Sequence, residues 1–181
     1  MAIEITYFVH GATTDNEKHL ATGWAGGELS EKGIKQSKEL GPLVADKHFD
    51  VVFCLDLKRA VDSANLNFPD REIIRDARLR ECNYGDFTQQ PSESFKADLA
   101  EWIDKPYPNG ESYRDVEKRI ADFLRFLKQN YQQKHIAIVA HEAPQLSLDV
   151  LLKNKTWPQA IAEDWRRTKC WQAGWEYNLQ E

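Results

Sequence analysis

The chain has 181 residues and a formal net charge of −5. Of these residues 41% are hydrophobic, which is enough apolar material for the core of one ordinary domain. The acidic balance, without any block of lysines and arginines, argues against a general nucleic-acid-binding protein. No signal-peptide pattern is present, and no apolar run approaches the roughly 18 residues of a membrane span. Three widely spaced cysteines form no C-x-x-C pair and leave one unpaired, which fits a reducing cytosol. Together with the charge and the absence of a membrane-length run, this predicts a cytoplasmic protein with neither a nucleic-acid nor a membrane partner.

Short β-rich runs alternate with segments of helical spacing along the chain. In chain order we expect strands and helices as follows: a strand at 3–9, a helix at 30–40, a strand at 49–54, a helix at 58–67, a short edge strand at 72–74, a helix at 113–131, a strand at 135–140, a helix at 146–152 and a final strand at 174–179. Ser30 is a plausible N-cap, and Ile34, Ser37 and Leu40 follow at helical spacing. Because no linker or repeat is visible, residues 1–181 are expected to form a single α/β domain.

Two histidines follow apolar runs that are far apart in the sequence. His10 comes directly after the first expected strand, and His141 comes directly after the run at 135–140. Ligands of parallel α/β sheets bind outside the carboxyl ends of the strands, so both imidazoles are expected at one site. Such a pair indicates phosphoryl chemistry or a metal site, and each histidine could alternatively be a hydrogen-bonded structural residue.

Arg59 and Glu81 are two further candidates for this site. Arg59 lies at the start of the expected helix 58–67, where a planar guanidinium and oriented backbone N–H groups suit a phosphate. Glu81 lies in a loop among turn residues. Taken singly, each is more often a solvated surface side chain or a capping carboxylate, but the four residues together favour a catalytic site.

The order of several short motifs resembles that of the histidine phosphatase superfamily, the phosphoglycerate mutase-like proteins. The motifs are His-Gly near the N-terminus, Leu-Ser-x-x-Gly-x-x-Gln at 29–36, Leu-x-Arg-Ala at 57–60, Leu-Arg-Glu-x-x-x-Gly-Asp at 79–86, Asn-Gly-Glu-Ser at 109–112 and a late strand followed by histidine. The match covers nearly the whole chain. It implies a three-layer α/β/α sandwich with a mostly parallel sheet and hydrolysis of phosphate monoesters through a phosphohistidine.

By this resemblance, His10 matches the nucleophile, Arg59 and His141 match phosphate-binding residues, and Glu81 matches the proton donor to the leaving oxygen. These roles agree with the chemistry of a neutral imidazole nucleophile, cationic stabilisation of phosphoryl oxygens and general acid catalysis. The partner is then a small phosphorylated substrate, and no metal or other cofactor is needed. Contacts to substrate are expected from Gly11, Asn16, Thr22, Gly23 and Glu142.

The sequence departs from the family pattern beside both histidines. Val9 stands where the family has arginine, and Glu142 stands where glycine is usual; Ala12, where many members have glutamate, is a milder change. One close charge interaction is worth about 4 kcal/mol at an effective dielectric constant of 20, so the first two changes disfavour phosphate strongly. Three explanations stay open: a substitute cation such as Arg78, Arg80 or Lys18, a weakened phosphatase with a narrow substrate range, or a non-catalytic protein that binds a ligand or a protein partner.

Other functional readings depend on weaker signals. A zinc site is disfavoured because the two histidines have no third ligand at a recognised spacing. Tryptophans crowd the last quarter of the chain, at Trp157, Trp165, Trp171 and Trp175. They are expected in the core or at an interface, with the alternative that some line the site and favour an aromatic or sugar-bearing leaving group. Trp24, beside Thr22 and Gly23, is a candidate for a substrate-facing residue on a loop.

Overall fold

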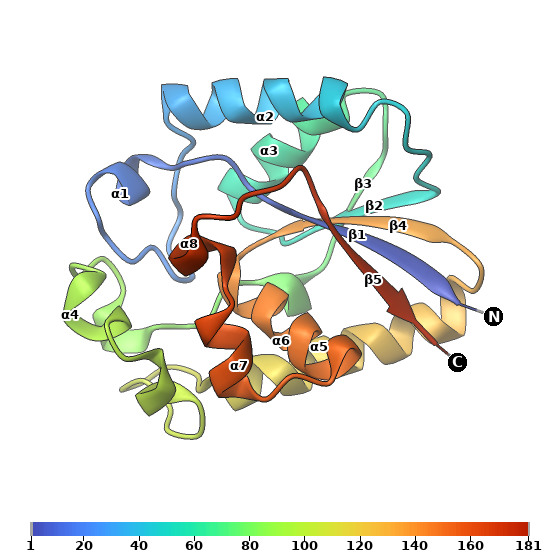
Figure 1. Cartoon of the computed structure of the whole chain (residues 1–181). Coiled ribbons are helices and arrows are strands. Elements are labelled where there is room, and N and C mark those ends of the chain that lie inside the picture. Colours follow the sequence, from blue (N-terminus) through green and yellow to red (C-terminus); the bar gives the residue numbers. More distant parts are fainter. Residues whose placement is uncertain (1, 181) are drawn as a thin grey trace.

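The computed structural model describes residues 2–180, and its centre is a five-stranded sheet (Figure 1). The strand order is β3-β2-β4-β1-β5, formed by β1 (Ile3–Val9), β2 (Val51–Cys54), β3 (Ile73–Arg75), β4 (His135–Ala140) and β5 (Trp175–Leu179). The first four strands are parallel, and β5 pairs with β1 in the antiparallel direction. The carboxyl ends of the parallel strands therefore meet at one edge of the sheet, where ligands of such sheets bind.

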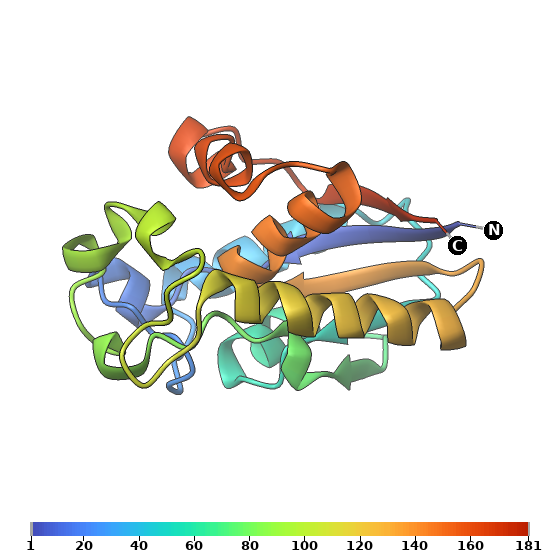
Figure 2. The ribbon, with the colours of Figure 1, turned by 90° about the horizontal axis from the view of Figure 1, so that it is seen from below.

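Helices cover both faces of this sheet. α2 (Glu31–Leu43) and α3 (Lys58–Asn67) lie on one face, and α5 (Tyr113–Asn130) and α6 (Glu142–Lys153) lie on the other (Figures 1 and 2). The expected three-layer α/β/α sandwich, with its mostly parallel sheet, is confirmed.

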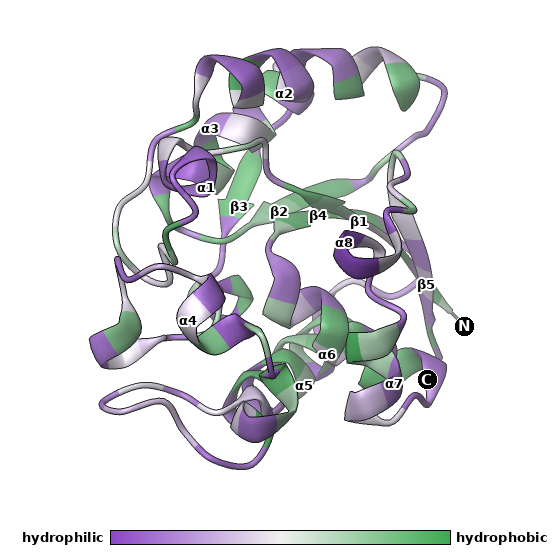
Figure 3. Cartoon of the chain, turned by 60° about the vertical axis from the view of Figure 1, so that its left-hand side comes forward, coloured by the Kyte–Doolittle hydropathy of each residue, from purple (hydrophilic) through white to green (hydrophobic). Residues whose placement is uncertain are grey.

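The alternation of side chains along β1 explains why two cores form. Tyr7 is buried in the larger cluster, on the side of α5, whereas Phe8 is buried in the cluster that contains Leu40 of α2 and Ala64 of α3. A strand covered on both faces needs apolar side chains at successive positions, which is why Tyr7, Phe8 and Val9 follow one another without a polar residue. Figure 3 shows the hydrophobic strands enclosed by helices that are largely hydrophilic on the outside.

The helices and strands expected from periodicity are all present, with two corrections. Ser30 caps α2 by accepting a hydrogen bond from the backbone N–H of Gly33, but Ile34 is 38% exposed, and Gly33 takes the inward position. Helix α6 begins at Glu142, directly after His141, and not at Leu146.

Several short helices had no prediction from the sequence. They are α1 (Thr14–Glu17), α4 (Glu93–Lys96), α7 (Trp157–Ala162), α8 (Trp165–Thr168) and the 3₁₀ turns η1 (Ala77–Leu79), η2 (Gly85–Phe87) and η3 (Leu99–Trp102). Most are too short for apolar periodicity to be visible. In Figure 1, α1, α4 and α8 lie around the carboxyl edge of the sheet. Across residues 2–180, no helix combines the length and the apolar character needed to cross a membrane.

Candidate active site

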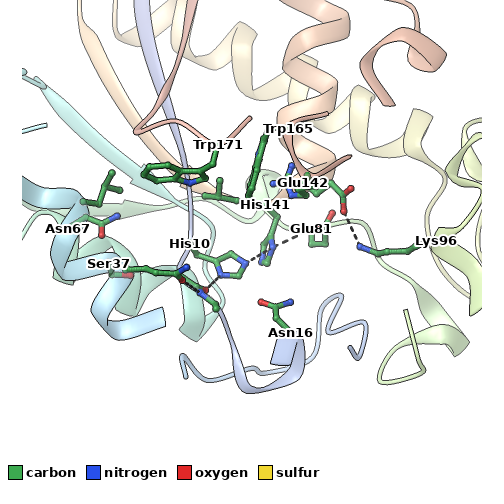
Figure 4. Close-up of a pocket in the computed structure, with 16 residues that line it drawn as sticks. His10, Asn16, Ser37, Asn67, Glu81, Lys96, His141, Glu142, Trp165 and Trp171 are labelled. Carbon is green, nitrogen blue, oxygen red and sulfur yellow. Dashed lines mark hydrogen bonds and ion pairs between the residues drawn. The ribbon is translucent and has the colours of Figure 1, made fainter. Parts of the chain in front are cut away.

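Neighbouring parallel strands bring His10 and His141 together. Val9 pairs in register with Ala140, so the residues that follow β1 and β4 lie side by side, and the backbone N–H of His10 donates to the carbonyl of Ala140 at 3.2 Å. The ring centroids of the two histidines are 3.9 Å apart at an interplanar angle of 70°. Figure 4 shows the two rings pointing toward each other at the centre of a cavity.

A chain of hydrogen bonds determines where the protons of these histidines lie. Arg59 Nε donates to His141 Nε2 at 2.7 Å, His141 Nδ1 is 2.7 Å from His10 Nε2, and His10 Nδ1 is 2.6 Å from the carbonyl oxygen of Gly11. A guanidinium can only donate and a carbonyl can only accept. His141 therefore donates from Nδ1 and His10 donates from Nδ1, so His10 Nε2 carries the lone pair.

Burial and positive charge keep both rings neutral. Burial and the nearby Arg59 guanidinium lower the pKa of His10 to about 3, against the weaker opposing effect of the Gly11 carbonyl. Burial, His10 and Arg59 lower the pKa of His141 well below its ordinary value. A neutral imidazole with an unprotonated Nε2 is the nucleophilic form of histidine.

Arg59 is 0% exposed and lies behind His141, outside the cavity lining. Besides its bond to His141, it donates from Nη1 to the carbonyl of Ala25 at 2.9 Å and from Nη2 to the carbonyl of Gly23 at 2.6 Å. All three sides of the guanidinium are thus bonded to protein, and in this structure Arg59 orients His141 instead of facing the cavity. The Thr22 hydroxyl donates to Asp15 Oδ2 at 2.9 Å, which fixes the same loop.

Gly11 is required for the close packing of the loop that follows β1. A Cβ on Gly11 would lie 2.3 Å from the carbonyl oxygen of Gly33 in α2, so any larger residue would push the loop away. The backbone N–H of Gly11 donates to Ser63 Oγ at 3.0 Å. The polar groups of Gly11 thus position His10 and the loop.

Glu81 approaches His141 from a loop and is 4% exposed. Its Oε1 accepts the backbone N–H groups of Cys82 at 2.8 Å and Ala143 at 3.1 Å, and its Oε2 lies 3.7 Å from His141 Nδ1. The indole N–H of Trp24 donates to the carbonyl of Glu81 at 2.7 Å. Trp24 therefore supports the loop of Glu81 and does not line the cavity.

Asn16 lies below the histidine pair in Figure 4 and lines the cavity. Its Oδ1 accepts the backbone N–H of Thr13 at 3.0 Å in a capping box at the start of α1. This bond orients the amide and leaves its NH₂ group available for a ligand.

The cavity has a volume of about 620 Å³, which is within the usual range for small-molecule sites. His10, His141, Glu81 and Asn16 are among the polar residues that line it. Trp165 and Trp171 line it on the side of the C-terminal segment, and Trp171 is 55% exposed (Figure 4). Trp157 and Trp175 are buried in the core, as expected for most of the tryptophans.

Two cations line the cavity, and neither was predicted. They are Lys96, the last residue of α4, and Arg166 of α8. The proposed substitutes Arg78, Arg80 and Lys18 do not line it; the first two are bonded to aspartates at 2.5 Å. The three named candidates were wrong, while the explanation that another cation reaches the cavity stays open. The two short helices that carry Lys96 and Arg166 leave no periodic signal in the sequence.

Glu142 is neutralised by these cations. Its Oε2 lies 3.0 Å from Lys96 Nζ, while Arg166 Nη1 donates to Asp164 at 2.9 Å. Burial alone would raise the pKa of Glu142, but Lys96 and Arg166 outweigh it and lower that pKa to about 2. The carboxylate is ionised and paired, so it repels a phosphate less than its sequence position suggests. The described part of the chain contains no group of three or more His, Cys, Asp or Glu side chains placed to hold a metal ion.

The mostly parallel sheet presents two neutral imidazoles to the cavity, and a carboxyl group lies beside them. This arrangement defines a class of α/β protein suited to phosphoryl chemistry. The chain belongs to the histidine phosphatase superfamily (branch 1), whose family model matches residues 7–172. The resemblance found in the sequence is confirmed.

Relatives in this family carry several activities. The chain is 31% identical over 175 residues to an adenosylcobalamin/alpha-ribazole phosphatase of Salmonella typhimurium, covering 91% of this chain and 86% of that protein. It is 29% identical over 170 residues to a 2,3-bisphosphoglycerate-dependent phosphoglycerate mutase of Allorhizobium ampelinum, covering 84% and 81%. The structure of the alpha-ribazole phosphatase from Shigella flexneri superimposes with a TM-score of 0.76 at 25% identity, covering 87% of this chain and 83% of that chain.

Proposed function

We propose that the protein hydrolyses phosphomonoesters through a phosphohistidine intermediate on His10. The observation that carries this proposal is the hydrogen-bond chain from Arg59 through His141 to His10, because it holds His10 neutral with its lone pair on Nε2. The Nδ1–H group of His141 points to this Nε2 atom of His10. When a phosphoryl group enters between the two rings, this N–H becomes a donor to a phosphoryl oxygen.

The reaction then has two steps. His10 Nε2 forms a bond to phosphorus, the ester P–O bond breaks, and the Glu81 carboxyl gives its proton to the departing oxygen. Water next attacks the phosphohistidine, the P–N bond breaks, and Glu81 takes the proton of the water. The products are the alcohol and inorganic phosphate, and both side chains return to their starting forms.

Hydrolysis is favoured over mutase chemistry, although relatives of both kinds exist. The segment between Glu81 and Asn109 is short, and it supplies few candidates for holding a carboxylated phosphosugar. The tryptophans on the opposite side of the cavity favour a leaving group with an aromatic face. The phosphatase activity for which the alpha-ribazole phosphatases are named is consistent with hydrolysis.

The test is a panel of aryl and alkyl phosphomonoesters assayed with the wild type and His10→Ala. We expect hydrolysis that falls at least a thousandfold in His10→Ala, with a phosphoenzyme in the wild type that is labile to acid and stable to base, as a phosphoramidate is. His48→Ala, a change in an exposed histidine far from the cavity lining, is the matched control. Glu81→Gln is expected to slow alkyl esters about a hundredfold and activated aryl esters much less.

A protein that binds phosphorylated ligands without hydrolysing them is the alternative outcome. It would give no hydrolysis of any ester and no phosphoenzyme, together with saturable binding of phosphate in the same cavity.

A further inference from the structure

The edge of the sheet supplies no cation to the cavity. Val9 lines the cavity at the position before the nucleophile, and Arg59 is buried with its donors bonded to His141, Gly23 and Ala25. A transferring phosphoryl group carries charge on its oxygens and depends on cationic groups for stabilisation. The required cation must therefore come from another part of the protein.

Lys96 lies where such a cation is needed. It lines the main cavity and also the smaller cavity beside it, and the residues that line both with it are Asn16, Glu81 and His141. Lys96 is thus at the junction of the two cavities, among the groups assigned to the phosphoryl site. Figure 4 shows its side chain extending toward Glu142 and Glu81.

The contacts of Lys96 leave it free to bind an anion. Its Nζ lies 3.0 Å from Glu142 Oε2 and 4.8 Å from the centroid of the Tyr84 ring. An ammonium group has three N–H donors. It can therefore keep its bond to Glu142 and donate to a phosphoryl oxygen, or exchange one for the other.

Arg166 has more contacts with protein side chains than Lys96 has, although its buried Nη2 has no hydrogen-bond partner among the described residues and its charge contributes to the lowered pKa of His10. It donates to Asp164 and Gln145 and stacks 4.6 Å over the ring of Trp165. It lines only the main cavity, whereas Lys96 lines both. Arg166 is therefore a second cation of the cavity, on the side of Trp165, whereas Lys96 lies at the junction of both cavities beside Glu81 and His141.

We propose that Lys96 binds the phosphoryl group in place of the arginine missing at position 9, and that Glu142 holds Lys96 in position while the site is empty. The inference rests on the proposed function for its catalytic consequence, but its binding consequence can be measured without turnover.

The binding test is a calorimetric titration with inorganic phosphate. We expect Lys96→Met to weaken phosphate binding about tenfold and Lys96→Arg to retain most of it. Lys105→Met is the matched control, because Lys105 follows in the same segment, pairs with Glu101 at 2.8 Å and lies 4.7 Å over the ring of Trp102, but does not line the cavity. It should bind phosphate as the wild type does.

The kinetic test combines changes at both partners in a double-mutant cycle. Lys96→Met should lower kcat/KM about a hundredfold with a larger loss in kcat than in KM, because the interaction is strongest in the transition state. Adding Glu142→Gln should recover part of that loss by removing a carboxylate left without its partner. In the presence of Lys96, Glu142→Gln should tighten phosphate binding.

Two results separate this inference from the proposed function. Phosphate binding that depends on Lys96 in a protein with no hydrolysis would overturn the function and keep the role of Lys96 in binding. Hydrolysis through His10 with Lys96→Met indistinguishable from Lys105→Met in phosphate affinity and kcat/KM would overturn the role of Lys96 and keep the function. Thermal unfolding of each variant establishes that it is folded in both measurements.

Discussion

The two sides of the cavity are built by different kinds of contact. On the nucleophile side, the histidines follow adjacent strands, and Arg59 and Gly11 connect them to backbone carbonyl groups. On the opposite side, Lys96 and Arg166 come from helices of four residues and are held mainly by other side chains.

This difference separates chemistry from recognition. Buried groups bonded to backbone keep one geometry, which a nucleophile and a proton donor require for preorganised catalysis. The ion pairs Lys96–Glu142 and Arg166–Asp164 join side chains that are each at most 26% exposed, and because they bond side chain to side chain, an anionic ligand can take the place of one partner without moving the backbone. We therefore expect changes on the nucleophile side to affect both folding and rate. Changes to the tryptophans on the opposite side should affect mainly substrate affinity and preference, whereas Lys96 also affects the rate through its contact with the transferring phosphoryl group.

The largest effect is expected for Arg59→Lys. An ammonium cannot reproduce the planar guanidinium that reaches His141, Gly23 and Ala25 at once, so some buried acceptors lose their donors. A lost hydrogen bond to a charged group costs roughly 1.5–3 kcal/mol, so the free energy of unfolding should fall by about 3 kcal/mol. Loss of the fixed His141 tautomer should lower kcat/KM about a hundredfold.

The measurements are urea denaturation and phosphomonoester kinetics, with Arg75→Lys, a change in the exposed arginine that ends β3, as control. Unchanged stability together with a large rise in KM alone would contradict the positioning role and would indicate that Arg59 turns into the cavity to bind phosphate directly.

This positioning role marks the limit of what the sequence predicts. The order of strands and helices and the meeting of His10 with His141 follow from local patterns, since apolar runs, capping residues and strand ends are local properties. Whether a guanidinium faces a cavity or lies behind a histidine depends on the path of the loop at 22–25, which is set by contacts distant in sequence. For the same reason the sequence did not predict that Lys96 and Arg166 line the cavity. Glu142 was predicted to contact substrate, but its pairing with Lys96 was not predicted.

A smaller loss in the free energy of unfolding is expected when pH is lowered. Burial and Arg59 depress the pKa of His10 to about 3 in the folded protein, against about 6.5 when unfolded. Below pH 6.5 the unfolded chain binds a proton that the folded chain does not, so this contribution to stability is complete above pH 6.5 and is lost as pH falls toward 3. The slope is about 1.4 kcal/mol per pH unit, or about 2 kcal/mol between pH 6.5 and 5.

His10→Gln removes this titration, so its free energy of unfolding should fall less steeply between pH 7 and 5 than that of the wild type. Denaturation at several pH values measures both slopes, with His48→Gln as the control that keeps the wild-type slope. Parallel slopes for wild type and His10→Gln would mean that His10 binds its proton at the same pH in the folded protein as in the unfolded chain, and this would contradict the lowered pKa of His10.

The smallest effect is expected on the recognition side, from Trp171→Ala. Trp171 lines the cavity but is 55% exposed, so its loss should scarcely affect folding. An aromatic contact is worth about 1 kcal/mol, which corresponds to a rise of about fivefold in KM for aryl phosphates with kcat nearly unchanged. Alkyl phosphates, which cannot stack, should be hydrolysed as before, and Trp171→Phe should keep most of the preference for aryl esters. Equal losses on aryl and alkyl esters would instead mean that Trp171 shapes the cavity as a whole, and the division between a fixed nucleophile side and an adaptable recognition side would then fail at this residue.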